Sequence, residues 1–371
     1  MPSELVSLFL NAVAVDAESL RERPMADFIT RYLADLPLDI REDSTAPLFN
    51  GECGNLICRP HHLDPARPSI ALLAHMDTPR PTRDVHPVVT DQRIESDGTT
   101  ALGVDNRAGA SILLHVVRRH LEAGGGGNFI VVFTVGEELG LYGSKHVDLA
   151  PYNVKACFVF DCSKRPGTFI QAAVGCSLYT AAFVGKPSHA AVAPEKGVNA
   201  IRMAANAIGS VPLGRLNPSM TSNIGTITGG SATNVVPARC TIEGEVRGFS
   251  AEPIDEHLHF LQTTFQRVAD ASGGSVEFAS HVDFAPFRLG EESDIVRLTN
   301  DVMHAVGLAP HPIEYLGGSD ANMLNARGIP AVNLGIGAQN PHGNDEFILL
   351  EDLFKAEEIA REIIQRSAVL P

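Results

Sequence analysis

Four short apolar runs dominate the pattern of hydrophobic and polar positions along the chain. They occupy residues 69–74, 129–135, 157–160 and 330–335. Nearly continuous apolar runs of this length predict strands buried on both faces, as in a parallel sheet covered by helices. Residues 106–120, between the first two runs, instead repeat their apolar positions at helical spacing. The pattern predicts a doubly wound α/β domain in residues 1–175 that resumes in 289–371.

Residues 176–288 carry a different pattern. Helical spacing is found at 198–208 and 253–269. Strands are expected around Phe183 and at 222–228, 240–247 and 276–284. This strand-helix-strand-strand-helix-strand order predicts a small antiparallel sheet with two helices on one face, an α+β (ferredoxin-like) arrangement. We therefore expect 176–288 to be a domain inserted into the first one.

The composition narrows the functional classes. The chain has 371 residues, 44% hydrophobic and 20% charged, an ordinary globular balance. A net charge of −15 and a pI near 5.3 argue against nucleic acid and anionic membrane as partners. No apolar stretch reaches the roughly 18 residues of a spanning helix, and no secretory signal is visible. The six cysteines show no C-x-x-C spacing, so we expect reduced thiols and a cytoplasmic location.

Residues able to bind metal follow several of the apolar runs. Ligands bind at the carboxyl ends of strands in such sheets, so these side chains should meet at one rim. Taken singly, each has an ordinary explanation, such as a helix-opening acid for Asp105 or a solvated loop histidine for His342. Their joint placement favours a metal site. The expected ligand residues are His75, Asp105, one of Glu137 and Glu138, Asp161 and His342.

Nitrogen and oxygen ligands together suit zinc, with cobalt and manganese as alternatives. Five ligands exceed one tetrahedral ion but fit two ions, about 3.5–4 Å apart, that share a bridging carboxylate. Asp77 follows His75 by two residues on an extended segment and is placed to accept the second ring N–H of that histidine. Of Glu137 and Glu138, whose side chains point apart, one could bind metal while the other acts as a base.

Five segments match, in order, motifs of a known superfamily. They are 74–78 (AHMDT), 103–106 (GVDN), 136–140 (GEELG), Asp161 and 341–343 (PHG). They resemble the two-zinc metallopeptidases that include peptidase T, carnosinase-like dipeptidases, aminoacylase and glutamate carboxypeptidase. The segments most similar to the peptidase T branch are 188–190, 194–197, 199–201, 223–226, 229–230, 234–237 and 318–321. The resemblance implies a doubly wound mixed-sheet zinc-hydrolase domain (1–175 and 289–371) with an inserted lid and dimerisation domain (176–288).

The resemblance also implies residue roles. It implies two divalent ions, in the first place Zn²⁺, bridged by the Asp105 carboxylate. One ion would also bind Glu138 and one histidine, and the other would bind Asp161 and the second histidine. Glu137 is the general base acting on a metal-bound water. The remaining roles are orientation of His75 by Asp77, binding of the developing oxyanion by His189, often across a dimer, and substrate contacts by Asn234, Arg247 and Gly318. A salt bridge on the lid surface is the structural alternative for Arg247.

The expected function is hydrolysis of short peptides by a peptidase T-like aminopeptidase, a di- or tripeptidase, with a homodimer formed through the lid. Aspartate at position 161 favours this because glutamate there accompanies many deacylases and carboxypeptidases among the relatives. The continuation DCSKR at 161–165 departs from the Gly-rich sequence of peptidase T itself. The alternatives are an N-acyl amino acid deacylase, a carboxypeptidase and, more distantly, a non-catalytic peptide- or metal-binding protein.

Overall fold

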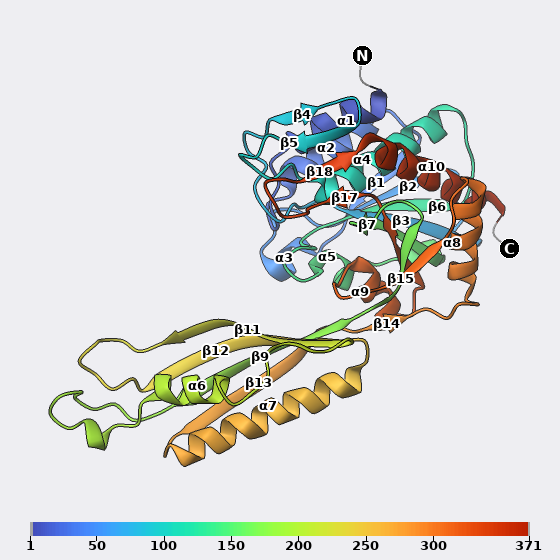
Figure 1. Ribbon diagram of the computed structural model, residues 1–371. Coiled ribbons are helices and arrows are strands. Elements are labelled where there is room, and N and C mark those ends of the chain that lie inside the picture. Colours follow the sequence, from blue (N-terminus) through green and yellow to red (C-terminus); the bar gives the residue numbers. More distant parts are fainter. Residues whose placement is uncertain (1–2, 370–371) are drawn as a thin grey trace. The chain divides into compact units, whose positions relative to one another are not determined.

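The computed structural model describes residues 3–369, and the chain forms two compact units (Figure 1). Unit 1 contains the segments up to Gln171, Leu289–Glu314 and from Ser319 onward; unit 2 contains Ala172–Arg288 and Tyr315–Gly318. Among the described residues, no helix has both the length and the apolar character needed to cross a membrane.

A mixed sheet forms the centre of unit 1. Its strands lie in the order β1-β2-β6-β3-β7-β16-β8, and β15 also pairs with β8. Their bounds are β1 (Leu38–Glu42), β2 (Leu56–Pro60), β3 (Ser69–His75), β6 (Phe129–Thr134), β7 (Val154–Cys162), β8 (Thr168–Ala173), β15 (His311–Tyr315) and β16 (Ala331–Gly335). The four apolar runs become the adjacent strands β6, β3, β7 and β16, which run parallel to one another. Every residue of β3, β6 and β16 is buried, which confirms the prediction of strands covered on both faces.

Helices cover the sheet of unit 1. They are α1 (Glu4–Val13), α2 (Arg23–Leu33), α3 (Ala46–Phe49), α4 (Val104–Glu122), α5 (Tyr142–His146), α8 (Asp294–Ala305), α9 (Asp320–Ala326), α10 (Leu350–Arg366) and the 3₁₀ turns η1 (Ala150–Tyr152) and η3 (Ser367–Val369). α4 packs on β3 and β7 between α1 and α10, whereas α9 packs on β7 and β16 beside α5. The core between these layers includes Phe133, Phe158 and Phe160, each fully buried. Burial of each such side chain stabilises the fold by about 1.5–3 kcal/mol.

A second, smaller sheet in unit 1 was not predicted. Its order is β17-β18-β5-β4, with bounds β4 (Pro87–Val89), β5 (Arg93–Ser96), β17 (Ala338–Gln339) and β18 (Phe347–Leu349). These strands have only two to four residues each, too few to show a periodic pattern. The sheet brings the loop after β17 next to the segment that precedes α4.

Unit 2 is a five-stranded antiparallel sheet in the order β10-β11-β12-β9-β13. Its elements are β9 (Gly175–Val184), η2 (Pro194–Lys196), α6 (Ala200–Ile208), β10 (Gly214–Asn217), β11 (Met220–Gly229), β12 (Arg239–Gly248), α7 (Ala251–Ala271), β13 (Ser275–Phe284) and the short β14 (Phe287–Arg288). In α7, Ile254, Leu258, Leu261 and Phe265 recur at helical spacing and are buried against the sheet. The predicted β-α-β-β-α-β order is confirmed, and β10 is an addition to it.

Candidate metal centre

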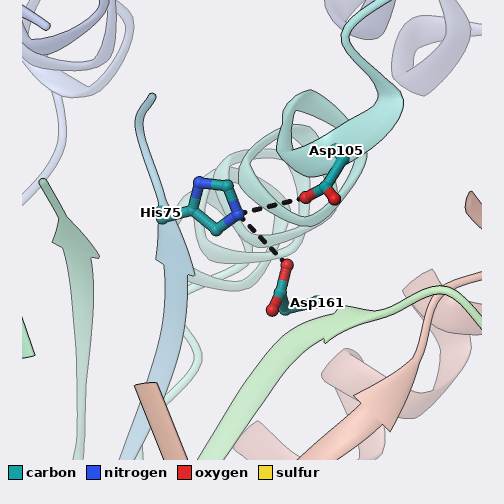
Figure 2. A group of neighbouring side chains, drawn as sticks. All are labelled: His75, Asp105 and Asp161. Atoms are coloured by element: carbon teal, nitrogen blue, oxygen red, sulfur yellow. Dashed lines mark hydrogen bonds and ion pairs between the residues drawn. The ribbon is translucent and has the colours of Figure 1, made fainter. Parts of the chain in front are cut away.

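Side chains from three elements converge at the carboxyl ends of β3 and β7 (Figure 2). His75 is the last residue of β3, and its Nε2 lies 3.1 Å from both Asp105 Oδ1 and Asp161 Oδ1. The second oxygen of Asp161 accepts a hydrogen bond from the Asn333 amide of β16, at 3.4 Å. His75 is 1% exposed, so this cluster is closed to solvent on the histidine side.

A second cluster shares Asp105 with the first. His342 Nε2 lies 3.4 Å from Asp105 Oδ2 and 3.5 Å from Glu138 Oε2. The two oxygens of Asp105 therefore face different histidines, which is the disposition of a carboxylate that bridges two ions. The side chain of His342 is 54% exposed, so this second position is the more open one.

The backbone around Asp105 is irregular. Asp105 (φ −83°, ψ 103°) and Asn106 depart from helical geometry, so regular helix begins after them. Asn106 accepts the Gly109 N–H at 2.9 Å and donates to the Phe160 carbonyl at 2.8 Å. Asp105 is thus not the helix-opening acid considered from the sequence, because Asn106 makes the capping contact. The extended backbone instead leaves the Asp105 carboxylate free to face both histidines.

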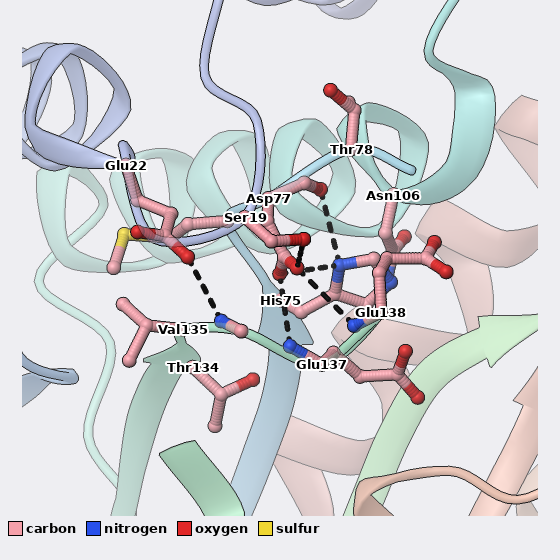
Figure 3. A network of polar contacts seen from close by, with 12 residues as sticks. Ser19, Glu22, His75, Asp77, Thr78, Asn106, Thr134, Val135, Glu137 and Glu138 are labelled. Carbon is pink, nitrogen blue, oxygen red and sulfur yellow. Dashed lines mark hydrogen bonds and ion pairs between the residues drawn. The ribbon is translucent and has the colours of Figure 1, made fainter. Parts of the chain in front are cut away.

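Asp77 connects several segments of the centre (Figure 3). Its Oδ1 lies 3.2 Å from His75 Nδ1, and its Oδ2 accepts a hydrogen bond from the Ser19 hydroxyl at 2.7 Å. It also accepts the backbone N–H groups of Glu137 and Glu138, each at 3.2 Å. Burial acts to raise the pKa of Asp77, but the hydrogen bonds from His75 and Ser19 outweigh it and lower the pKa. Asp77 therefore fixes both the His75 ring and the turn that carries the two glutamates.

The centre has an excess of negative charge. Burial, together with the nearby charge of Asp105, raises the pKa of Glu138 to about 8. Burial and the charge of Asp161 raise the pKa of Glu137 well above its ordinary value. The hydrogen bond to Asp105 raises the pKa of His342 to about 8. Each shift shows that the site favours added positive charge.

A metal ion satisfies this arrangement. His75 Nδ1 contacts the carbonyl and carboxylate of Asp77, so it carries the ring proton. Nε2 faces two carboxylate oxygens, and although burial opposes it, these oxygens raise the pKa of His75 well above its ordinary value. A second ring proton or a metal ion at Nε2 satisfies both oxygens, and a metal ion binds there by displacing that proton. Three groups of donor atoms close enough to hold an ion are His75–Asp105–Asp161, Asp105–Glu138–His342 and His75–Glu137–Glu138. The residues present therefore fit two divalent ions bound by nitrogen and oxygen.

The other residues singled out from the sequence lie in unit 2. His189 Nδ1 accepts the backbone N–H groups of Ala191 and Val192, each at 3.2 Å, so a neutral His189 carries its proton on Nε2. The Arg247 guanidinium forms a fork with both oxygens of Glu245, at 3.0 and 2.9 Å, and lies over the Phe284 ring. A Cβ on Gly318 would lie 2.5 Å from that same ring.

The Asn234 backbone carbonyl accepts the Ala190 N–H at 3.0 Å, which brings Asn234 beside the His189 segment. For Arg247, the pairing with Glu245 is the salt bridge weighed as its structural alternative. The spacing Glu245-x-Arg247 could have indicated it, because residues two apart in a strand share a face.

Some supporting residues carry no signal in the sequence. Ser19 and Glu346 lie outside every motif and every periodic segment of the sequence. Glu22 is fully buried and accepts the Gly136 N–H at 2.9 Å, beside the turn of Glu137. Burial and the charge of Asp77 raise the pKa of Glu22 to about 7. These residues act by hydrogen bonds across long sequence separations, which a local pattern does not reveal.

The sequence and the fold also match known proteins. A model of the peptidase dimerisation domain matches residues 173–273, and a model of the M42 glutamyl aminopeptidases matches residues 84–169. Protein YqjE of Bacillus subtilis is 33% identical over 98% of each chain. The crystal structure of aminopeptidase PepT from Bacillus cereus is 33% identical, with a TM-score of 0.85 over 98% of each chain. A tripeptidase structure from Staphylococcus aureus is 32% identical, with a TM-score of 0.89 over 99% of this chain and 98% of the other.

The fold and these relatives define a hydrolase of the peptidase class, and the clustered histidines and carboxylates are its candidate metal ligands. The similarity to these relatives extends over nearly the full length of both chains. The chain belongs to the peptidase T-like family of the M20 metallopeptidases.

Proposed function

We propose that this protein is a two-metal aminopeptidase that removes the first residue of short peptides. The observation that carries the proposal is the convergence of two histidines and two further carboxylates around the shared Asp105, with Glu137 beside them. The similar proteins from Bacillus cereus and Staphylococcus aureus are described as an aminopeptidase and a tripeptidase, which supports the same substrate class. A non-catalytic binding protein is disfavoured because both the ligand set and the candidate base are complete.

Two metal positions follow from the donor atoms. His75, Asp105 and Asp161 would hold one ion, and Asp105, Glu138 and His342 the other. We propose zinc at both positions, with cobalt or manganese as substitutes, because imidazole and carboxylate ligands suit these ions. When bound, the ions supply Lewis-acid polarisation of the scissile carbonyl and lower the pKa of water.

Glu137 is the proposed general base. Its backbone N–H donates to Asp77, the carboxylate that also holds the His75 ring and the Glu138 N–H, so the base is positioned together with two of the proposed metal ligands. In the reaction Glu137 accepts a proton from water as the oxygen attacks the scissile carbonyl carbon. It then delivers that proton to the leaving amine as the C–N bond breaks. Proton transfer of this kind contributes about 10²–10⁴-fold in rate.

His189 is the proposed donor to the oxyanion that develops on the carbonyl oxygen. Its Nδ1 is occupied by two backbone N–H groups, which leaves an Nε2–H able to donate. Preorganised donors of this kind stabilise a developing charge most effectively because they need no reorientation during the reaction. We propose that His189 acts through a homodimer of lid domains, in line with the match of residues 173–273 to a dimerisation domain.

The polarity of cleavage provides the direct test. A free α-amino group is expected to bind near the acidic centre, and blocking it would leave a buried carboxylate without a partner. That loss costs about 1–3 kcal/mol, or about 5- to 150-fold in kcat/KM. The zinc-loaded protein is incubated separately with trialanine, its N-acetyl form and its C-terminal amide. The kcat/KM values of the three peptides are compared, and the products are identified by mass spectrometry. We expect alanine to be released from the N-terminus and the N-acetyl form to be the poorest substrate; faster cleavage of the N-acetyl form would indicate a deacylase or carboxypeptidase instead.

A further inference from the structure

Glu346 is a buried carboxylate that lies outside both groups of metal ligands. It precedes β18 and is 1% exposed. Its Oε2 accepts the backbone N–H of Gly103 at 2.6 Å, and its Oε1 accepts the backbone N–H of Asp105 at 3.1 Å. The two oxygens thus hold the chain on both sides of Val104, which is fully buried.

The segment held by Glu346 needs this support. Gly103 has a φ of 79°, in the left-handed region, and Asp105 is extended, so no regular helix satisfies their backbone N–H groups. Leaving a buried N–H without an acceptor costs about 1–3 kcal/mol. A Cβ on Gly103 would lie 2.8 Å from the Thr82 side chain, so glycine is needed at this position for both its φ angle and its close approach. Glu346 therefore determines the backbone position from which the Asp105 side chain extends.

The same loop carries a metal-ligand candidate. His342 lies four residues before Glu346, and its carbonyl accepts a hydrogen bond from the Arg80 guanidinium at 3.3 Å. Arg80 also donates to the Asn344 side chain at 2.7 Å. The Glu346 carbonyl in turn accepts the Ser96 N–H at 3.0 Å, which attaches this end of the loop to β5. The loop between β17 and β18 thus carries the candidate ligand His342 and, through Glu346, also holds the backbone of Asp105.

We infer that Glu346 is a positioning residue for the metal position formed by Asp105, Glu138 and His342, because it sets the distance between the backbone of Asp105 and the loop of His342. This inference rests on the proposed two-metal function. Asp105 serves both positions, but the other position depends less on Glu346 because its two remaining ligands are held elsewhere: Asp161 by β7 and Asn333, and His75 by β3 and Asp77. Loss of the two hydrogen bonds from Gly103 and Asp105 to Glu346 should therefore lower the affinity for one metal ion more than the affinity for the other.

The test measures how tightly the purified, metal-free protein binds each of two Zn²⁺ ions, by calorimetric titration. Glu346→Gln replaces one acceptor oxygen with an NH₂ group that faces a backbone N–H. Mutation of such a supporting partner typically costs about 10- to 100-fold in metal affinity, and we expect this loss for one equivalent, with the other within about threefold of the wild type. Glu346→Asp keeps two acceptor oxygens and should give a smaller loss. Asp352→Asn is the control: Asp352 is also a buried carboxylate, but it accepts from Arg165 and not from the Asp105 segment.

The outcomes separate this inference from the proposed function. Binding of two equivalents by Glu346→Gln with wild-type affinities would overturn the inference alone, as would equal weakening of both equivalents or equal loss in Asp352→Asn. Failure of the wild-type protein to bind two ions would overturn the proposed function. Circular dichroism of each metal-free variant verifies folding, and Glu346→Asp keeps the test decisive if Glu346→Gln does not fold. Excess Zn²⁺ should restore kcat in Glu346→Gln with KM unchanged, which a general folding defect would not produce.

Discussion

Substitution of Gly109 by alanine should destabilise the protein, although alanine is the better helix former. A Cβ at position 109 would lie 2.1 Å from the Phe160 carbonyl oxygen and 2.3 Å from Asn106 Oδ1. Alanine gains about 1 kcal/mol over glycine inside a helix. Against this, overpacking costs about 1–3 kcal/mol, and loss of the Asn106 capping contact costs about 1 kcal/mol. The expected net effect is a loss of about 1–3 kcal/mol in the free energy of unfolding.

The measurement is urea unfolding of the metal-free protein, because bound metal would add its own stabilisation. Gly126→Ala is the matched control: within residues 3–369, no heavy atom apart from those of its chain neighbours lies within 4 Å of a Cβ at that position, and its change should stay within about 0.5 kcal/mol. Gly109→Ala should also weaken metal binding, since the contact of α4 with β7 sets the separation of Asp105 from Asp161. A Gly109→Ala protein as stable as the wild type, or more stable, would refute the steric argument.

Three further predictions concern the chemistry. Glu137→Gln should keep both metal ions and lose about 10²–10⁴-fold in kcat, measured by metal analysis and peptide kinetics; parallel loss of metal would make Glu137 a ligand. If His189 acts across a dimer, mixing inactive His189→Ala and Glu137→Gln proteins should restore part of the activity, and a fully active monomer in light scattering would contradict this. Metal affinity should fall as the pH drops below about 8, because Glu138 and His342, both with pKa values raised to about 8, then hold protons that the metal must displace. Calorimetry in buffers of different ionisation enthalpy should detect proton release near pH 7. Absence of that release would count against these two residues as ligands.

The rim of the sheet could be predicted because strand ends are encoded locally. An apolar run followed by a polar side chain identifies both the strand and the residue at its carboxyl end. Parallel pairing then brings His75 and Asp161 to the same edge. The helix of unit 2 at 251–271 was likewise predictable, because its buried positions repeat at helical spacing.

The residues that hold the candidate ligands in place could not be predicted, because their hydrogen bonds join segments that are distant in the sequence. Ser19 and Asp77 are 58 residues apart, and Glu346 and Gly103 are 243 residues apart. Each contact joins a loop side chain to a partner that only the folded chain brings near, and neither Ser19 nor Glu346 lies in a periodic segment. The small sheet of β4, β5, β17 and β18, which places Glu346 beside the Asp105 segment, was not predicted because its strands are too short to show a periodic pattern.

The start of α4 contributes to the metal centre on two sides. Asp105 faces the histidines, and two residues later the side chain of Arg107 is fully buried behind them. Its guanidinium donates to the carbonyls of Met76 and Val15, and so joins the end of β3 to the N-terminal segment. Burial lowers the pKa of Arg107 to about 10, which still leaves it charged at neutral pH. This fixed positive charge favours the ionised form of Asp77, and an ionised Asp77 keeps the ring proton of His75 on Nδ1. The segment that opens α4 therefore carries a candidate metal ligand and also maintains the histidine tautomer that could bind an ion.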